Sequence, residues 1–330
     1  MKINKKDFTS IIGQDESEAK LAKLHGKKYI EYRELFNKAQ KLEFDSNYPL
    51  QLDFELNYSC NLSCPMCTWS TEDKKGKGKN TWFSFETYKK IISDGVKNGL
   101  KAVRLNYINE PLIRRDIAKF IRYAKDVGIV EVYLSTNGTL LTKSLAKDLI
   151  ESGLTRIQVS IDAVNSETYN KIRKGGDYNE IVDNVIAFVN IRNEMNRVEP
   201  QVRVNFVKTN DNIHELDEFI DKWKNIVDLV GIQDLVGIMD NSANLEKQRD
   251  FKCTQPFYHL TIRYDGTVLP CCSFFGADIP IDKIDPDGEV NIKKIWNSKE
   301  INFIREIHSK NEYYRHPVCK KCINSTSYID

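Results

Sequence analysis

The sequence predicts an α/β protein in which a parallel sheet wrapped by helices is followed by a small cysteine-rich α+β domain. Two observations carry this prediction. Strand-like apolar segments alternate with helix-length amphipathic segments from residue 49 to residue 238, and five of the eight cysteines lie in the last 78 residues. Strands that alternate with crossover helices form parallel sheets. With 330 residues, the chain is long enough for a full-sized domain and a smaller one.

Six strands and five helices are expected within residues 49–238. The strands are Leu52–Leu56, Ala102–Tyr107, Val130–Ser135, Arg156–Ile161, Gln201–Val207 and Val227–Gly237. The helices are Ser84–Lys97, Asp116–Val127, Lys143–Ser152, Tyr178–Glu194 and Asn212–Trp223. Ligands of such sheets bind at the carboxyl ends of the strands, so functional residues are expected there.

The flanking segments have other patterns. Residues 1–48 are charged and helix-like, with Tyr29, Tyr32 and Leu35 on one helical face, which predicts a helical extension. Residues 239–252 are polar, without strong periodicity, and are expected to be a linker.

The last segment, residues 253–330, is expected to form a separate small domain. Tyr258–Arg263 and Thr267–Cys271 are short strands around Asp265-Gly266, which is a hairpin signal. Ile292–Ile307 has the periodicity of one amphipathic helix.

The composition narrows the class of partner. The formal net charge of +2 comes from 49 basic and 47 acidic residues, and it does not favour nucleic-acid binding. No run of about 18 apolar residues is present, so no membrane helix is expected. The N-terminus, MKINKKDFTS, lacks the apolar segment of a signal peptide, which favours a cytoplasmic protein. In that compartment cysteines serve more often as metal ligands than in disulfides.

Three cysteines directly after the first expected strand are candidate metal ligands. Cys60, Cys64 and Cys67 have the spacing C-x3-C-x2-C. Three thiolates can hold three irons of a cubane iron–sulfur cluster and leave the fourth iron open to a small molecule. A zinc site is the competing interpretation, although structural zinc usually has four protein ligands in two pairs. Three thiols without a shared function are the other alternative.

The segment CNLSCPMC, which contains these cysteines, resembles the cluster loop of the radical S-adenosylmethionine (SAM) superfamily. The resemblance implies a partial (β/α)6 TIM-like barrel and a [4Fe–4S] cluster that binds SAM. It also implies an electron donor such as flavodoxin or ferredoxin, and a 5′-deoxyadenosyl radical that takes hydrogen from the substrate. Met66 stands where the family usually has an aromatic residue, and methionine is also a large polarizable side chain that can pack on a flat ring.

The resemblance further implies SAM contacts at the strand ends. Glu110 lies in YINEP, where the family often has Gly-Gly-Glu-Pro; the acid is present, but Ile108 and Asn109 replace the glycines. Asn137 lies in a Thr-Asn-Gly turn after the third strand. The remaining expected contacts are Ser160, Asp162, Arg173 and Asn205. Helix capping and turn formation are the alternative roles for several of these side chains.

Four C-terminal cysteines form a second candidate metal site: Cys253, Cys271, Cys319 and Cys322. Their order, around a hairpin and then in a terminal C-x2-C pair, resembles the SPASM/twitch extension of radical SAM enzymes, which carries auxiliary iron–sulfur clusters. The count fits the short form with one auxiliary [4Fe–4S] cluster, and structural zinc is the competing interpretation. Cys272 is left over, as a bystander, a substitute ligand or a catalytic hydrogen donor.

These expectations predict a radical SAM oxidoreductase (dehydrogenase) or epimerase that acts at a carbinol carbon of a carbohydrate, cyclitol or nucleotide-sugar. If an electron leaves through an auxiliary cluster and a base takes a proton, an alcohol becomes a ketone. If a thiol returns hydrogen to the opposite face, the carbon is epimerised. A peptide-modifying maturase is the alternative enzyme, although about 50 N-terminal residues are few for a peptide-recognition domain. A non-enzymatic iron–sulfur or zinc module is the alternative of another class.

Overall fold

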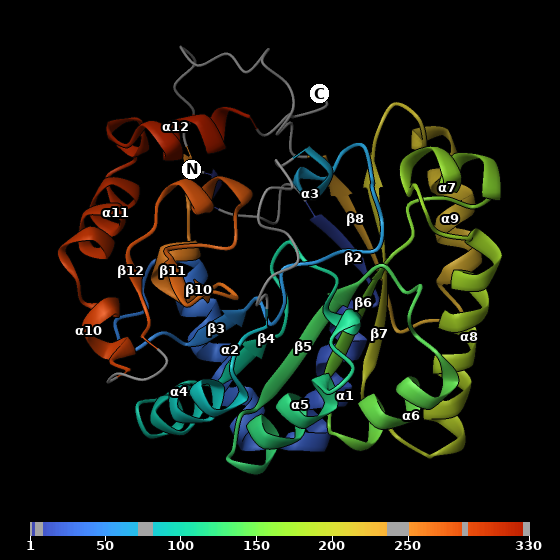
Figure 1. The fold of residues 1–330 in the computed structure, drawn as a ribbon, viewed down its shortest axis with the longest axis horizontal. Coiled ribbons are helices and arrows are strands. Elements are labelled where there is room, and N and C mark those ends of the chain that lie inside the picture. Colours follow the sequence, from blue (N-terminus) through green and yellow to red (C-terminus); the bar gives the residue numbers. More distant parts are fainter. Residues whose placement is uncertain (1, 4–8, 72–81, 236–250, 286–289, 326–330) are drawn as a thin grey trace.

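A ten-stranded sheet organises the molecule (Figure 1). The computed structural model describes residues 2–3, 9–71, 82–235, 251–285 and 290–325. The sheet has the strand order β12-β11-β10-β3-β4-β5-β6-β7-β8-β2. Its six parallel central strands are β3 (Gln51–Phe54), β4 (Ala102–Arg104), β5 (Glu131–Thr136), β6 (Arg156–Ser160), β7 (Gln201–Lys208) and β8 (Leu229–Asp234).

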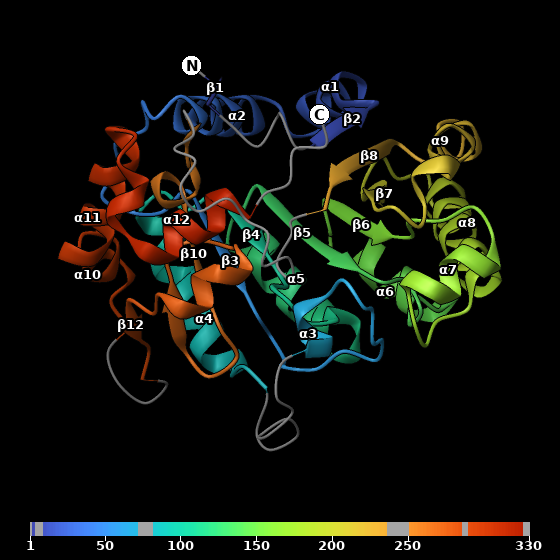
Figure 2. The same ribbon diagram turned by 90° about the horizontal axis from the view of Figure 1, so that it is seen from above.

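The helices between these strands cover the outer face of the curved sheet (Figure 2). They are α4 (Phe85–Lys97), α5 (Ile117–Asp126), α6 (Lys143–Glu151), α7 (Ser166–Ile172), α8 (Tyr178–Glu194) and α9 (Leu216–Trp223); a short helix, α3 (Thr68–Thr71), follows the cysteine loop. The expected helix over Asn212–Trp223 begins with a 3-10 turn, Ile213–Glu215. The predicted partial (β/α)6 TIM-like barrel is confirmed.

Alternation along the strands separates an apolar outer face from a polar inner face. On β3, Leu52 and Phe54 belong to the main core, and the ring of Phe54 lies 4.9 Å from that of Tyr88 on α4. Successive side chains of a strand point to opposite faces, so Gln51 and Asp53 face the barrel interior. The same alternation continues on the neighbouring strands, and it gives the barrel a polar inner wall.

The N-terminal segment differs from the expected helical extension. Thr9–Ile12 forms strand β2, which pairs antiparallel with β8 and makes one edge of the sheet. Helices α1 (Gln14–His25) and α2 (Lys27–Gln40) follow it, and β1 (Lys2–Ile3) pairs with β9 (Phe251–Lys252). The strand was missed because a four-residue edge strand has too few residues to show a period.

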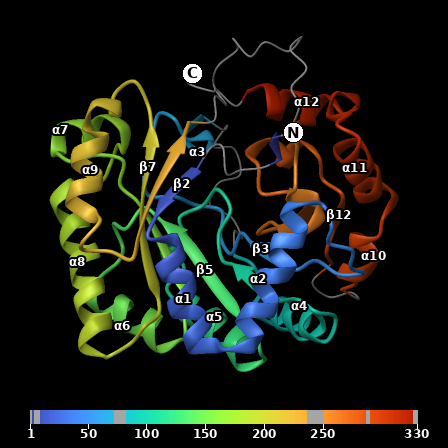
Figure 3. The ribbon, with the colours of Figure 1, turned by 180° about the vertical axis from the view of Figure 1, so that it is seen from behind.

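Helices α1 and α2 lie on the side of the sheet away from α4 and α5 (Figures 2 and 3). The hydroxyl of Tyr32 donates to the carboxylate of Glu131 at 2.7 Å, and Arg156 contacts Glu18 at 2.8 Å. Glu131 and Arg156 are the first residues of β5 and β6. The helix pair therefore closes the barrel at the amino ends of its strands and leaves the carboxyl ends for ligands.

The C-terminal segment joins the same sheet. Strand β10 (His259–Ile262) pairs parallel with β3, and β11 (Thr267–Leu269) and β12 (Asp282–Lys283) extend the sheet beyond it. The single helix expected over Ile292–Ile307 is wrong: α10 (Ile292–Trp296) ends before Ser298, whose hydroxyl caps α11 (Lys299–Ser309). Helix α12 (Pro317–Asn324) closes the described chain.

Two further expectations concern the linker and the absence of a membrane helix. Most of the linker expected at 239–252 lies outside the described residues, and only Phe251 and Lys252 are seen, in β9. Within the described residues, no helix combines the length and the apolar character needed to cross a membrane.

Candidate functional site

The first cysteine group lies on the loop that follows the carboxyl end of β3. Cys64 is buried, and Cys60 and Cys67 are half-buried. The backbone N–H of Cys67 donates to the carbonyl of Cys64 at 3.0 Å, which folds the loop into a turn. Met66 is partly buried and packs against the main core.

The three thiols interact with one another. The pKa of Cys60 is raised to about 12, mainly by burial and to a smaller extent by the neighbouring Glu110, Cys64 and Cys67. Deprotonation of such a group is unfavourable unless a cation is present, and a metal cluster supplies that cation. The donor set therefore fits an iron–sulfur cluster held by three thiolates.

Two expected SAM contacts reach this loop from other strands. The amide of Asn137, after β5, lies 3.9 Å from Sγ of Cys60 and donates to Oδ1 of Asn61 at 2.9 Å. Nη1 of Arg173, after α7, lies 3.8 Å from Sγ of Cys64. The structure thus brings Asn137 and Arg173 to the cysteine loop.

Glu110 is buried next to the same loop. Its Oε1 accepts from the hydroxyl of Thr136 at 2.7 Å and from the N–H of Leu112 at 3.0 Å, and its Oε2 accepts from the N–H of Asn137 at 2.7 Å. Burial raises the pKa of Glu110 to about 7 despite these donors. The contact with Leu112 is a cap of the short 3-10 turn Pro111–Ile113, as the alternative interpretation had it. Oε2, with one donor, retains capacity for a second.

Asp162 and Arg173 form a buried ion pair. Nε of Arg173 donates to Oδ2 of Asp162 at 2.7 Å, and Nη2 contacts the same oxygen. Oδ1 accepts from the backbone N–H of Val207 at 2.8 Å. Asp162 is fully buried, so its carboxylate fixes the guanidinium that faces the cysteine loop.

Ser160 and Asn205 lie side by side at the carboxyl ends of β6 and β7, where they are register partners. Asn205 is buried, and its Oδ1 has no hydrogen-bond partner within the described chain. A buried amide oxygen without a donor is unfavourable, so this atom is available to a bound ligand.

The four C-terminal cysteines line one cavity of about 50 Å³. Cys319 and Cys322 lie three residues apart on α12 and therefore share a face. Burial raises the pKa of Cys271 strongly, and the neighbouring Cys253 and Cys322 raise it further. Four thiols that line one cavity, two of them on α12, fit a second metal cluster.

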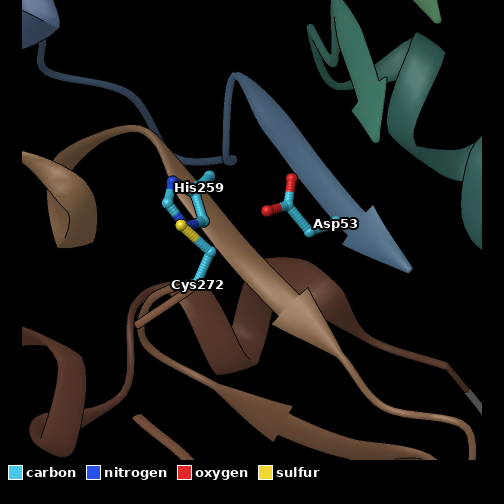
Figure 4. Close-up of side chains that lie close together, drawn as sticks. All are labelled: Asp53, His259 and Cys272. Carbon is cyan, nitrogen blue, oxygen red and sulfur yellow. The ribbon is translucent and has the colours of Figure 1, made fainter. Parts of the chain in front are cut away.

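Cys272 does not line that cavity. Its Sγ lies 3.4 Å from Oε1 of Gln255, and the side chain approaches Asp53 on β3 and His259 on β10 (Figure 4). The ligand atoms of Asp53, His259 and Cys272 all lie within 4.8 Å of one another, close enough to share a proton or a metal ion. Asp53 and His259 are almost fully buried, at 0% and 1% exposure. The surplus cysteine thus belongs to the polar inner wall.

Sequence reasoning missed Asp53 and His259. Asp53 lies inside the first expected strand, where a charged residue between Leu52 and Phe54 was a signal of a polar inner face. His259 had no such signal, because only the parallel pairing of β10 with β3 brings it near Asp53.

Tyr107 connects the two cysteine sites. It begins the YINEP segment that contains Glu110, and its hydroxyl donates to the carbonyl of Ser273 at 2.8 Å. The hydroxyl of Ser273 lies 3.2 Å from Sγ of Cys322. One tyrosine therefore ties the strand-end segment beside the first site to the loop of the second.

Comparisons with known proteins define the class. Residues 54–222 match the radical SAM superfamily, and residues 253–323 match SPASM, described as an iron-sulfur cluster-binding domain. The chain belongs to the radical SAM superfamily. It is a radical SAM enzyme with SAM and two [4Fe–4S] clusters as its cofactors, as expected from the cysteine motifs.

Several individual proteins are similar to this chain. A probable GTP 3′,8-cyclase of Methanocaldococcus jannaschii is 28% identical over 189 residues, 57% of this chain and 60% of that protein. One of the same name from Sulfurisphaera tokodaii is 32% identical over 165 residues, 50% of this chain and 49% of that protein. The chain thus spans about half to three fifths of the length of these relatives.

Solved structures share the fold. BtrN in complex with AdoMet and 2-DOIA has a TM-score of 0.53 and 19% identity, with 83% of this chain and 92% of that chain covered. Streptococcus suis SuiB bound to precursor peptide SuiA has a TM-score of 0.59 and 17% identity, with coverages of 84% and 71%.

Proposed function

We propose that this enzyme takes a hydrogen atom from a polar small molecule, a carbohydrate, cyclitol or nucleotide-sugar, and oxidises or epimerises a carbinol carbon. The observation that carries this proposal is the polar inner wall between the two cysteine sites. Asp53, Glu55 and Thr261 are buried there, and each has a side-chain oxygen without a hydrogen-bond partner in the described chain. Hydroxyl groups of a substrate can satisfy such atoms, whereas an apolar substrate would leave them unpaired.

Residues at the strand ends are proposed to hold the first cluster and SAM. When bound and reduced, these cofactors supply the 5′-deoxyadenosyl radical. Cys60, Cys64 and Cys67 hold the cluster, and the inferred SAM contacts are Met66, Glu110, Asn137, Ser160, Asp162, Arg173 and Asn205. Asp162 acts through Arg173, because its carboxylate is already occupied by that guanidinium. A flavodoxin or ferredoxin is the proposed electron donor.

Cys253, Cys271, Cys319 and Cys322 are proposed to hold an auxiliary cluster at the second site. Such a cluster would supply an acceptor for one electron of the substrate radical. Loss of that electron, together with loss of the hydroxyl proton, leaves a ketone. His259 is a candidate acceptor of this proton, since the carboxylate of Asp53 lies beside it and can stabilise an imidazolium.

Cys272 is proposed to serve the epimerisation route. Its S–H bond would break as a new C–H bond forms on the opposite face of the substrate carbon. The thiyl radical left on sulfur needs one electron and one proton to become a thiol again, and the external electron donor is the source of that electron. The position of Cys272 on the inner wall, apart from the four-cysteine cavity, favours this role over that of a substitute ligand.

Metal analysis tests the two cluster sites. After anaerobic reconstitution we expect about 8 iron and 8 sulfide per wild-type chain, and about 4 of each in C60A/C64A/C67A. The triple variant should form no 5′-deoxyadenosine from SAM. A different result would contradict the auxiliary cluster and the oxidation route that depends on it. That result is about 4 iron in the wild type and none in the triple variant, with zinc bound at the four-cysteine site instead.

Product analysis tests the substrate class. Nucleotide-sugars and cyclitols are incubated with the reduced enzyme in D2O, and 5′-deoxyadenosine and products are measured by mass spectrometry. Epimerisation predicts deuterium in the product and its loss in C272A, whereas oxidation predicts a product two hydrogens lighter. A panel in which no sugar or cyclitol raises 5′-deoxyadenosine formation above the substrate-free rate would refute the proposed substrate class.

A second candidate reaction is cyclisation of a purine nucleotide, favoured by the relatives named GTP 3′,8-cyclase. GTP in the same assay distinguishes it, because cyclisation gives a product without loss of two hydrogens.

A further inference from the structure

The arginines of the inner wall differ in their partners. Residues 104, 156, 203 and 263 all alternate with residues of the apolar outer face. Arg104 pairs with Asp53 at 3.7 Å, Arg156 with Glu131 at 2.5 Å and with Glu18 at 2.8 Å, and Arg263 with Glu55 at 3.0 Å. Arg203, on β7, has no comparable acid within the described residues.

The guanidinium of Arg203 is largely enclosed. Its Nε and Nη2 are buried and have no hydrogen-bond partner in the part of the chain that the structure describes, although the residue as a whole is partly exposed. A buried charge without a partner is strongly unfavourable, whereas one paired with an anion is not. The side chain therefore has the properties of a binding group whose partner arrives from outside the protein.

The neighbouring strand leaves room for this guanidinium. A Cβ atom at Gly231, on β8, would lie 2.2 Å from both Nε and Nη2 of Arg203. Any other residue at position 231 would force the guanidinium to move. Glycine at this position thus preserves the unpaired arginine in its place.

The position of Arg203 suits a substrate beside SAM. Its backbone lies two residues before Asn205 on β7, about 6.6 Å deeper in the barrel, and Asn205 is the register partner of Ser160. Its guanidinium reaches Gly231, the register partner of Asn205 on β8, and so lies next to the level of these proposed SAM contacts. Burial and the nearby Arg156 lower the pKa of Arg203 to about 10, which leaves it charged at neutral pH.

We propose that Arg203 binds an oxyanion, a phosphate or carboxylate group carried by the substrate, and thereby anchors that substrate in the barrel. This inference rests on the proposed function, in which the barrel interior is the substrate site. The ligand then has two kinds of group: hydroxyls that meet the oxygens of Asp53, Glu55 and Thr261 without a hydrogen-bond donor in the described chain, and an anion that meets Arg203. A guanidinium can give an oxyanion two parallel hydrogen bonds, which fixes orientation as well as affinity.

Calorimetry with two simple anions tests the proposal. Reconstituted enzyme in low-salt buffer is titrated anaerobically with inorganic pyrophosphate and, separately, with malonate. We expect the wild type to bind at least one of them, R203Q to bind it at least about tenfold more weakly, and R203K to fall between because lysine cannot bind in the bidentate way. The anion that binds more tightly identifies phosphate or carboxylate as the substrate group.

Two further variants serve as controls. In G231A the new methyl group should displace Arg203 and weaken anion binding without removing the charge. Arg305 is also a partly buried arginine, but its Nε donates to the carbonyl of Pro256 and its guanidinium stacks on Trp296. R305Q should therefore bind the anions as the wild type does. Iron content confirms that each variant is folded.

Three results would overturn the proposal: no binding of either anion by the wild type, wild-type affinity in R203Q, or an equal loss in R305Q. Because calorimetry uses the anion alone, its outcome is independent of SAM cleavage. A wild-type protein that binds pyrophosphate but forms no 5′-deoxyadenosine would support the anion site and contradict the proposed function.

Discussion

The fold raises the pKa of two buried carboxyl groups, those of Glu55 and Glu110. They are 0% and 2% exposed, and burial raises the pKa of each to about 7. Arg263 lies 3.0 Å from Glu55 and only partly offsets this effect. Since the ordinary value is 4.5, the folded chain binds these protons more tightly than the unfolded chain does. The contribution of these two protonated groups to the free energy of unfolding is therefore greatest below about pH 4.5, and it is lost as the pH rises to about 7.

Replacing Glu55 by glutamine should remove its share of this pH dependence. Between pH 5 and pH 8 we expect E55Q to lose less stability than the wild type, by about 1–3 kcal/mol, because the amide has no proton to release. Thermal unfolding of the reconstituted protein at several pH values measures the difference. Glu86 is an exposed glutamate, so E86Q should follow the wild-type profile. Parallel profiles for E55Q and the wild type would contradict the raised pKa.

Individual residues of the site were predictable where they lie on strand-end loops with recognisable spacing. Cys60, Cys64 and Cys67 are the clearest case, because their spacing alone indicates a shared ligand. Asp53 and Arg203 could be placed on an inner face by strand alternation, but not matched with partners. Their surroundings depend on which strands become neighbours, and a single sequence carries no direct record of that.

At the scale of helices and strands, the sequence-based predictions are wrong where a helix-capping residue interrupts a regular spacing of apolar residues. The apolar residues of Ile292–Ile307 keep a helical spacing across Asn297, but the hydroxyl of Ser298 accepts from the N–H of Ile301 at 3.4 Å and begins a new helix. Ser298 is thus a cap inside a periodic segment. Ile304 and His308 of the capped helix line the four-cysteine cavity, so its start affects the second site.

Loss of this cap should weaken the C-terminal site. We expect S298A to lower stability by about 1 kcal/mol, since an N-cap serine replaced by alanine leaves a helical N–H without an acceptor. Thermal unfolding and iron content are measured together, with S309A as the control, because Ser309 lies exposed at the other end of the same helix. Equal effects of the two substitutions would show that Ser298 is not acting as a cap.

At the scale of the whole molecule, the barrel and the cysteine-rich segment share one sheet and one core. Strand β10 lies between β3 and β11, and Leu260 and Ile262 of β10 are fully buried in the same core as the barrel strands. Trp296 of α10 donates to the carbonyl of Ser46, before the barrel begins. The sequence predicted the hairpin, but β10 joins β3 from more than 200 residues away, so this pairing was not visible.

A chain that ends at residue 252 should therefore not fold into a stable barrel. It would lose β10 and expose the hydrogen-bonding edge of β3 and the apolar side chains beneath it. Burial of each large apolar side chain contributes about 1.5–3 kcal/mol, and domains are stable by only about 5–15 kcal/mol in total. We expect the truncated chain to be insoluble, or to lack cooperative unfolding and the first cluster.

The control is full-length C319A/C322A, which loses second-site thiols but keeps every strand and should still unfold in one transition. A soluble 1–252 chain with about 4 iron and the unfolding temperature of the control would show that the barrel is stable without β10.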